Sequence, residues 1–73
     1  MSEYLVVIER EGNSWGAYVP DLPGVGVVAD TREEVEQLVR EAVAFHLEAL
    51  REAGDPIPPP SAVGTTLVDV PAA

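Results

Sequence analysis

Hydrophobic and polar residues follow two different periods along this chain. Stretches rich in β-branched and aromatic residues predict strands over residues 3–9, 15–20, 25–29 and 65–70. Gly12 and Asn13 supply turn chemistry between the first two stretches, which therefore predict an antiparallel hairpin. Residues 32–53 instead repeat apolar side chains at helical spacing. The order βββαβ predicts an α+β fold, in which one helix packs on an antiparallel-rich sheet.

The predicted helix carries its own start and stop signals. Thr31 followed by Glu34 forms a capping box, and Gly54 suits the left-handed residue that ends a helix before Pro56. Its apolar arc covers roughly half the circumference, more than the ~100° needed to cover one sheet face. The excess indicates contact with a second chain. The arc consists of Val35, Leu38, Val39, Ala42, Val43, Phe45, His46, Leu47, Ala49, Leu50 and Ala53.

Length and composition predict one small domain over residues 1–73, with a Pro-rich connector at 55–61. A chain of this size buries only about 60% of the surface that it exposes when unfolded, so its core is marginal. It has no Cys, and one His is too few for a zinc site, so neither a disulfide nor zinc stabilises it. We therefore expect self-association, with a dimer favoured.

The charge balance narrows the class of partner. The sequence has 13 Asp and Glu against 4 Arg and Lys, a formal charge of −9. Because nucleic-acid binders cluster basic residues and the four arginines here are scattered, direct nucleic-acid binding is disfavoured and a basic protein partner is favoured. The alternative, that the acidity only keeps the protein dispersed, stays open. No basic leader and no apolar run of about 20 residues is present, which predicts a cytoplasmic protein with no membrane partner.

Three motifs in a fixed order carry a family resemblance. They are Tyr-Val-Pro-Asp-Leu-Pro-Gly at 18–24, Asp-Thr-x-Glu-Glu at 30–34, and Gly-x-Pro-Ile-Pro-Pro-Pro-Ser at 54–61, preceded by Leu-Glu-Ala-Leu at 47–50. Over residues 4–61 the chain resembles the HicB antitoxin family. The resemblance implies a partial ribonuclease-H-like fold without ribonuclease activity. It also implies a partner, a small basic HicA-like RNA-cleaving toxin that the protein binds and neutralises. Many relatives carry a second, DNA-binding domain, which we expect to be missing here.

The residues themselves do not favour catalysis. Ribonuclease-H chemistry needs several carboxylates around divalent metals, and the strand candidates are Glu3, Glu9, Asp30 and Asp69. Solvated strand ends explain these acids better. His46 has no Ser or Cys nucleophile predicted beside it, so we interpret it as a core or interface residue. We predict no catalytic residue, no metal, no cofactor and no enzymatic activity.

Candidate contact residues follow from aromatic and acidic character. Trp15 and Tyr18 fall on opposite faces of one strand, so one packs under the helix while the other is free to anchor a partner. The alternative is that both are ordinary sheet residues. We select as partner contacts Trp15, Tyr18, Asp21, Leu22, Glu33, Glu34 and Glu41. The leading hypothesis is a HicB-like antitoxin, and the alternative is an orphan structural or regulatory interaction domain of the same fold without a toxin.

Overall fold

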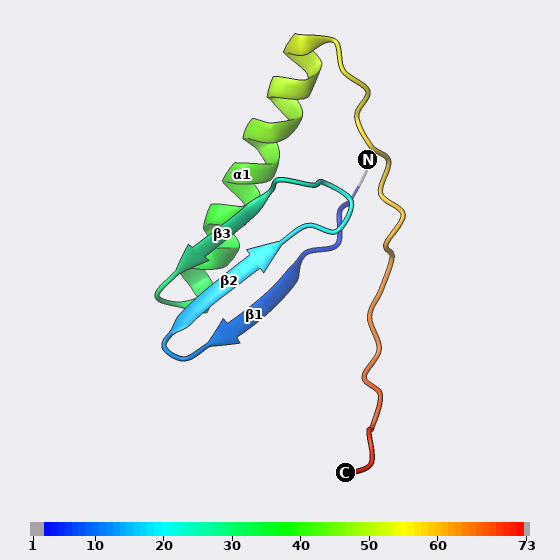
Figure 1. Cartoon of the computed structure of the whole chain (residues 1–73). Helices are drawn as coiled ribbons and strands as arrows, with labels where there is room; N and C mark the ends of the chain where they lie inside the picture. The colour runs from blue at the N-terminus through cyan, green and yellow to red at the C-terminus, as the bar shows by residue number, and fades with distance from the viewer. Residues whose placement is uncertain (1–2, 73) are drawn as a thin grey trace.

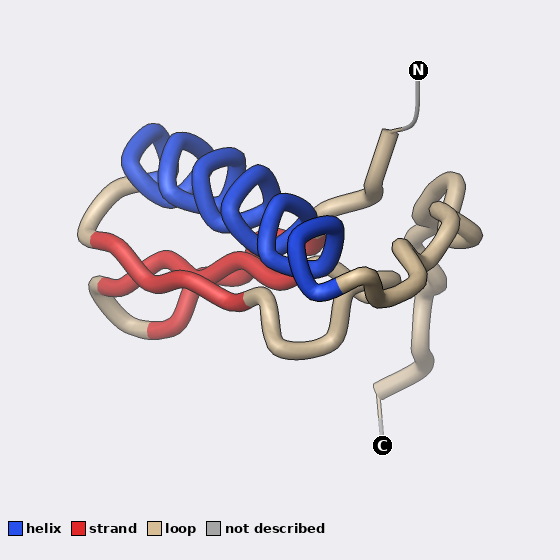
Figure 2. The backbone as a smooth tube through the Cα atoms, turned by 90° about the horizontal axis from the view of Figure 1, so that it is seen from above, coloured by secondary structure: helices blue, strands red, loops and turns tan. Residues whose placement is uncertain are grey.

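A computed structural model describes residues 3–72, in which a three-stranded antiparallel sheet is followed by a long helix (Figure 1). The strands lie in the order β1-β2-β3. The elements are β1 (Val7–Glu11), β2 (Ser14–Tyr18), β3 (Gly26–Ala29) and α1 (Arg32–Ala53). The helix lies in a second layer across one face of the sheet (Figure 2). This arrangement confirms the predicted α+β class.

A tight turn fixes the register of the hairpin. Gly12, the first of two loop residues, has φ 60°, as the two-residue hairpin turn with Gly at its first position requires. The closing pair is Glu11 opposite Ser14, and the register continues to Val7 opposite Tyr18. On the other side of β2, Ala17 pairs with Val27. Side-chain alternation then gives the sheet one face toward α1 and one face away from it.

The core is small and lies between α1 and the two strands beneath it, β2 and β3. The Val35 and Val39 side chains of α1 belong to the same buried cluster as Ala17, at the centre of the sheet. Ile8, Trp15 and Val27 pack around this centre from the same sheet face. Helix packing on the sheet therefore uses the row of side chains that alternation places inward. The buried residues are Ala17, Val19, Leu22, Val25, Val35 and Val39.

The loop between β2 and β3 contributes part of this core. The Leu22 N–H donates to the Val19 carbonyl at 3.1 Å, and the Val25 N–H donates to the Leu22 carbonyl at 3.2 Å. These two turns fold the loop back over the end of the sheet and bury the Leu22 side chain completely. The Pro-Asp-Leu-Pro-Gly segment thus contributes the buried Leu22 side chain to the core.

Both predicted helix signals are present in α1. The Thr31 hydroxyl accepts from the Glu34 N–H at 3.1 Å and lies 3.1 Å from the Glu34 carboxylate. Gly54 adopts φ 73°, and its N–H donates to the Arg51 carbonyl, ending the helix in a left-handed cap. The acids of the first turn and Arg51 in the last turn suit the helix dipole.

The second and third predicted strands differ from β2 and β3 by one or two residues at their ends, and the first and fourth differ more. The first begins at Val7, four residues later than predicted, and continues to Glu11. Residues 65–70 form no strand at all, and their side chains are exposed. High β propensity forms a strand only beside a partner strand, and this segment lies apart from the sheet in both views (Figures 1 and 2). The described part of the fold is therefore βββα, followed by an extended chain.

Candidate interaction surfaces

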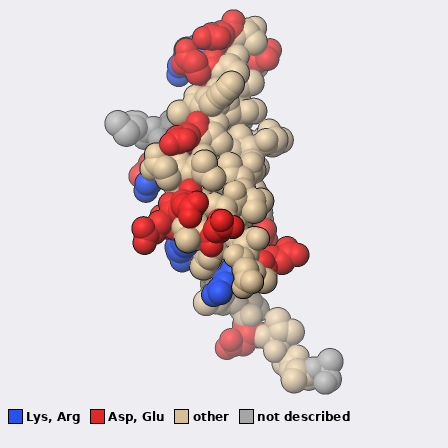
Figure 3. Space-filling view, turned by 90° about the vertical axis from the view of Figure 1, so that its left-hand side faces the viewer, with Lys and Arg blue, Asp and Glu red and all other residues tan. Residues whose placement is uncertain are grey.

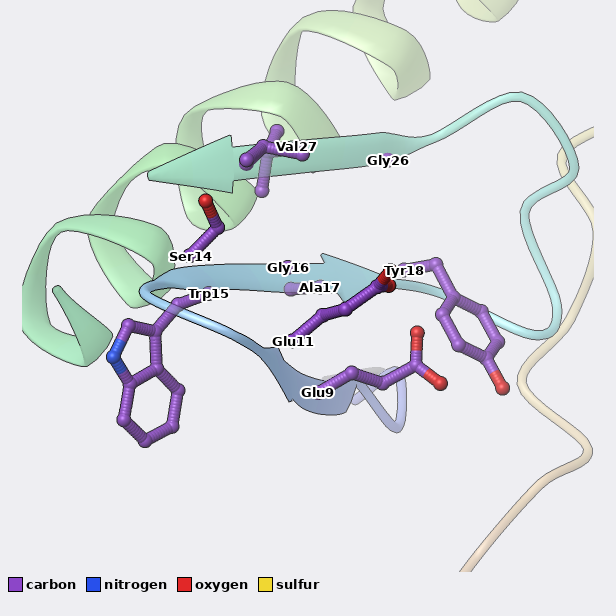
Figure 4. Close-up of a pocket in the computed structure, with 10 residues that line it drawn as sticks. Glu9, Glu11, Ser14, Trp15, Gly16, Ala17, Tyr18, Gly26 and Val27 are labelled. Carbon is purple, nitrogen blue, oxygen red and sulfur yellow. The ribbon is translucent and has the colours of Figure 1, made fainter. Parts of the chain in front are cut away.

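The sheet face that points away from α1 is uncovered, and we call it the open sheet face. Val7, Glu9 and Glu11 reach it from β1, because they alternate with the inward Ile8 and Arg10. The other residues of this face are Ser14, Gly16 and Tyr18 from β2, and Gly26 and Val28 from β3. Figure 4 shows Glu9, Glu11 and Tyr18 projecting from the strands around this region.

The open sheet face combines a shallow apolar floor with an acidic border. Gly16 and Gly26 lack side chains, so the centre is a hollow of about 460 Å³. Tyr18 and Val28 border it with 43% and 70% of their surface exposed. Glu9 and Glu11 are exposed on the β1 side. Carboxylates beside exposed apolar groups can pair with a basic side chain while the apolar groups pack against its neighbours.

Trp15 belongs to the opposite face. It is half-buried at the edge of the core, and the Arg10 guanidinium lies over its ring, 5.4 Å from the centroid. A cation at this distance interacts favourably with the indole face. Trp15 and Tyr18 thus point to opposite sides of the sheet, as alternation predicts, and Tyr18 is the one that is exposed on the open sheet face.

The flank of α1 beside β3 is a second exposed surface. Leu38 is 39% exposed and Phe45, two turns further along the helix, is 66% exposed. Acidic side chains run along the side of the molecule that α1 forms, and fewer basic ones are visible there (Figure 3). Part of this acidity is already paired, because Gln37 donates to Glu41 at 2.9 Å and Glu34 takes part in the cap. Glu33 is exposed in the first helical turn.

Asp21 holds the C-terminal connector against the body of the protein. Its carboxylate accepts from the Ser61 N–H at 2.9 Å, the Ser61 hydroxyl at 2.7 Å and the Ala62 N–H at 3.0 Å. These three donors, led by the Ala62 N–H, lower the pKa of the Asp21 carboxyl from its usual value. The Tyr4 hydroxyl donates to the Pro58 carbonyl of the same connector. We call this set of contacts the Asp21 clamp.

The predicted contact residues do not form one surface. Leu22 lies in the core with its side chain completely buried, unlike the other selected residues. Asp21 is engaged in the clamp, Trp15 lies at the core, and Tyr18 is on the open sheet face. Sequence reasoning missed Glu9, Glu11 and Val28 as members of that face, although strand alternation around Tyr18 was enough to find them.

Residues 3–72 contain neither a cluster of metal-binding side chains nor a membrane-spanning helix. In that range no three His, Asp or Glu side chains gather where they could hold a metal ion. Glu3, Glu9 and Asp69 are exposed, as is Asp30 between β3 and α1. No helix of the described chain is both long enough and apolar enough to cross a membrane.

The comparison with protein families matches nearly the whole chain. Residues 4–71 fit the model of the HicB-like antitoxins of bacterial toxin–antitoxin systems. The chain belongs to this family. Among curated relatives, Antitoxin HicB 2 of Photorhabdus laumondii is 36% identical over 73 residues, covering 94% of this chain and 50% of that protein. The resemblance read from the three sequence motifs is therefore confirmed.

A second relative comes from a phage. An uncharacterized 14.9 kDa protein in the rep-hol intergenic region of Haemophilus phage HP1 is 33% identical over 55 residues, covering 75% of this chain and 41% of that protein. This HicB-like chain thus spans half or less of the length of both relatives. No solved structure matches it significantly.

Proposed function

We propose that this chain binds and neutralises a small basic HicA-like RNA-cleaving toxin in the cytoplasm, without catalysing a reaction. Membership of the HicB-like antitoxin family supports a toxin as the class of partner. The net charge of −9 supports a basic one, because complementary fields raise the rate of encounter and suppress wrong partners. Neutralisation then consists of covering the working surface of the toxin.

The open sheet face is the observation that carries this proposal. Glu9 and Glu11 offer carboxylates, and Tyr18 and Val28 offer exposed apolar surface, around a floor that the two glycines leave open. Side-chain alternation puts Arg10 on the opposite face, so the strands bring no Lys or Arg to this one within residues 3–72. An aromatic side chain beside unopposed acids fits a partner surface rich in Lys and Arg.

Co-expression with a small basic HicA-like toxin tests the proposal. We expect the two to co-purify, growth to be restored, and RNA cleavage by the purified partner to stop at equimolar antitoxin. The double substitution Glu9→Lys with Glu11→Lys should weaken binding by about tenfold or more, since two attractive contacts become repulsive.

A matched control changes charge equally elsewhere. Asp55→Lys with Asp69→Lys alters the net charge by the same amount at two exposed positions that belong to no strand or helix. It should weaken binding much less than the β1 pair. Equal effects of the two pairs would leave only a generic charge effect, and absence of any complex would remove the proposed function. The homodimer expected from the sequence stays a prediction, which sedimentation equilibrium measures.

A further inference from the structure

The two edges of the sheet differ in how they are protected. β1 carries Glu9, Arg10 and Glu11, and charged residues on an edge strand discourage pairing with another chain. β3 reads Gly-Val-Val-Ala and has neither a charge nor a proline. It is nevertheless an edge strand, because β2 is its neighbour on one side and the sheet ends on the other. β3 is thus the edge that remains open to a further strand.

The backbone of β3 offers specific groups to such a strand. In an antiparallel sheet the N–H and C=O of one residue point to the same side, and successive residues alternate. The hairpin closes at Glu11 and Ser14, so β2 directs Trp15 and Ala17 toward their β3 partners, Ala29 and Val27. The backbone groups of Gly26 and Val28 therefore face outward at the free edge.

The α1 flank supplies an apolar wall along this edge. Phe45 stands over a hollow between the helix and the start of β3 and is itself largely exposed. Leu38 continues the wall two turns nearer the N-terminal end of the helix, and Val28 is exposed on the opposite side of the strand. The hollow is lined by Gly24, Val25, Ala42, Phe45, His46 and Ala49. A strand laid on β3 would cover Phe45 with its inward side chains.

The charges around this edge select the occupant. At 100° per residue, Glu34, Glu41 and Glu52 fall on the same flank of α1 as Phe45, and Asp30 follows β3 directly. The helical arginines fall on other sides, and Arg40 and Arg51 line the groove beside Tyr4 and Val6. A second copy of this chain, itself at −9, would bring acid against acid along the helix flank. A basic strand meets opposite charge instead.

We propose that the free edge of β3 accepts an extended strand from a basic protein. The N–H and C=O groups of Gly26 and Val28 pair with its backbone. Its apolar side chains cover Phe45 and Leu38, and its Lys or Arg side chains reach the acids of the α1 flank. Such strand addition takes affinity from the backbone and specificity from alternate side chains. The inference rests on the proposed function for the identity of the partner, and it names the edge at which that partner docks.

Hydrogen–deuterium exchange on residues 1–73, mixed with the small basic toxin of the proposed function, tests the edge directly. The amides of Gly26 and Val28 should become protected by about tenfold or more on complex formation, because each gains a hydrogen-bond partner. The outward amides of the other edge, Ile8 and Arg10, serve as the internal control and should change little. Protection at Ile8 and Arg10 in place of Gly26 and Val28 would overturn the proposal.

Substitution at the wall provides a second readout. Phe45→Ala should weaken binding about tenfold or more, as expected for an aromatic anchor at an interface. Val63→Ala removes an apolar side chain that is 92% exposed in the C-terminal segment and should leave binding unchanged. Circular dichroism confirms that both variants are folded. Wild-type affinity of Phe45→Ala would contradict docking on this wall.

A synthetic peptide separates failure of this inference from failure of the proposed function. If no small basic HicA-like protein binds at all, the proposed function fails, and the peptide Arg-Thr-Val-Thr-Val-Thr-Arg, whose Arg and Val side chains fall on one face of a strand, is titrated alone. We expect amide shifts centred on Gly26 and Val28 in the wild-type chain and smaller ones in Phe45→Ala. Shifts elsewhere, no shifts, or self-association of the chain through β3 would each rule out a basic strand as the occupant.

Discussion

The two halves of α1 behave differently although they share one apolar pattern. In the first half Val35 and Val39 are buried, whereas in the second half Phe45 is largely exposed and Ala49 is exposed. Length explains the contrast. A helix of 22 residues is about 33 Å long at 1.5 Å per residue, and a strand of five residues spans only about 17 Å. The helix is longer than the sheet, so its first half provides the fully buried residues, whereas its second half adds only partly buried side chains, such as Val43 and Leu47, and leaves Phe45 exposed.

The largest expected effect is a loss of stability when a buried residue of α1 is substituted, compared with an exposed one. Val35→Ala should lower the free energy of unfolding by about 2 kcal/mol, because it removes buried methyl groups and leaves a cavity. Phe45→Ala deletes a larger side chain but should change stability by no more than about 0.5 kcal/mol, since most of that side chain is in solvent. Urea unfolding of both variants measures this. A loss at Phe45 as large as that at Val35 would abolish the distinction.

A smaller effect is expected at the start of the packed half. Thr31→Ala removes the hydroxyl that accepts the Glu34 N–H and should cost about 1 kcal/mol. Thr31→Ser keeps the oxygen and should retain most of the stability, while Thr66→Ala in the exposed segment should have no effect. Thermal unfolding compares the three variants. Equal melting temperatures for Thr31→Ala and Thr66→Ala would show that the cap contributes nothing to the fold.

The smallest effect concerns the connector, which packs on the body without belonging to the core. The clamp lowers the pKa of Asp21, so its stabilising contribution is complete above the ordinary carboxyl pKa of about 4. It is lost as the pH falls through the lower, folded-state pKa. We therefore expect the Ser61 and Ala62 amide signals to move to their unclamped positions only in acid below the ordinary carboxyl range, as the pH falls through the lowered pKa of Asp21. Asp21→Ala should give those positions at pH 7. If neither the acid nor Asp21→Ala moves the Ser61 and Ala62 signals from their wild-type positions at pH 7, the Asp21 contacts are absent in solution.

Local signals in the sequence predicted local structure well. The capping box at Thr31 and the left-handed Gly54 depend on residues a few positions away, and the hairpin depends on a two-residue turn. The pairing of Asp21 with Ser61 spans 40 positions, and no periodicity encodes it. The burial of Leu22 depends on two hydrogen-bonded turns in its loop. These turns are not evident from the Pro-Asp-Leu-Pro-Gly motif alone.

The segment at 65–70 shows the limit of propensity most clearly. Its β-branched residues predicted a strand, yet a strand needs a neighbour, and the connector leads this segment away from the sheet. The candidate surfaces were predictable in part. Helical projection indicated that the apolar arc is wider than one sheet face can cover, and Phe45 is the large residue of this arc that is most exposed. The edge at β3 required the strand order, which one sequence alone does not provide.

The Asp21 clamp also affects where proteases can cleave the chain. Cleavage requires a stretch of backbone that can extend into an active site, and exposed segments with small and polar residues offer one. Prolines and the Asp21 contacts hold residues 55–62, whereas Val63, Leu67 and Val70 are exposed beyond them. Brief digestion should therefore trim the chain back to the neighbourhood of Ala62 and then stall, leaving the sheet and helix as a resistant fragment.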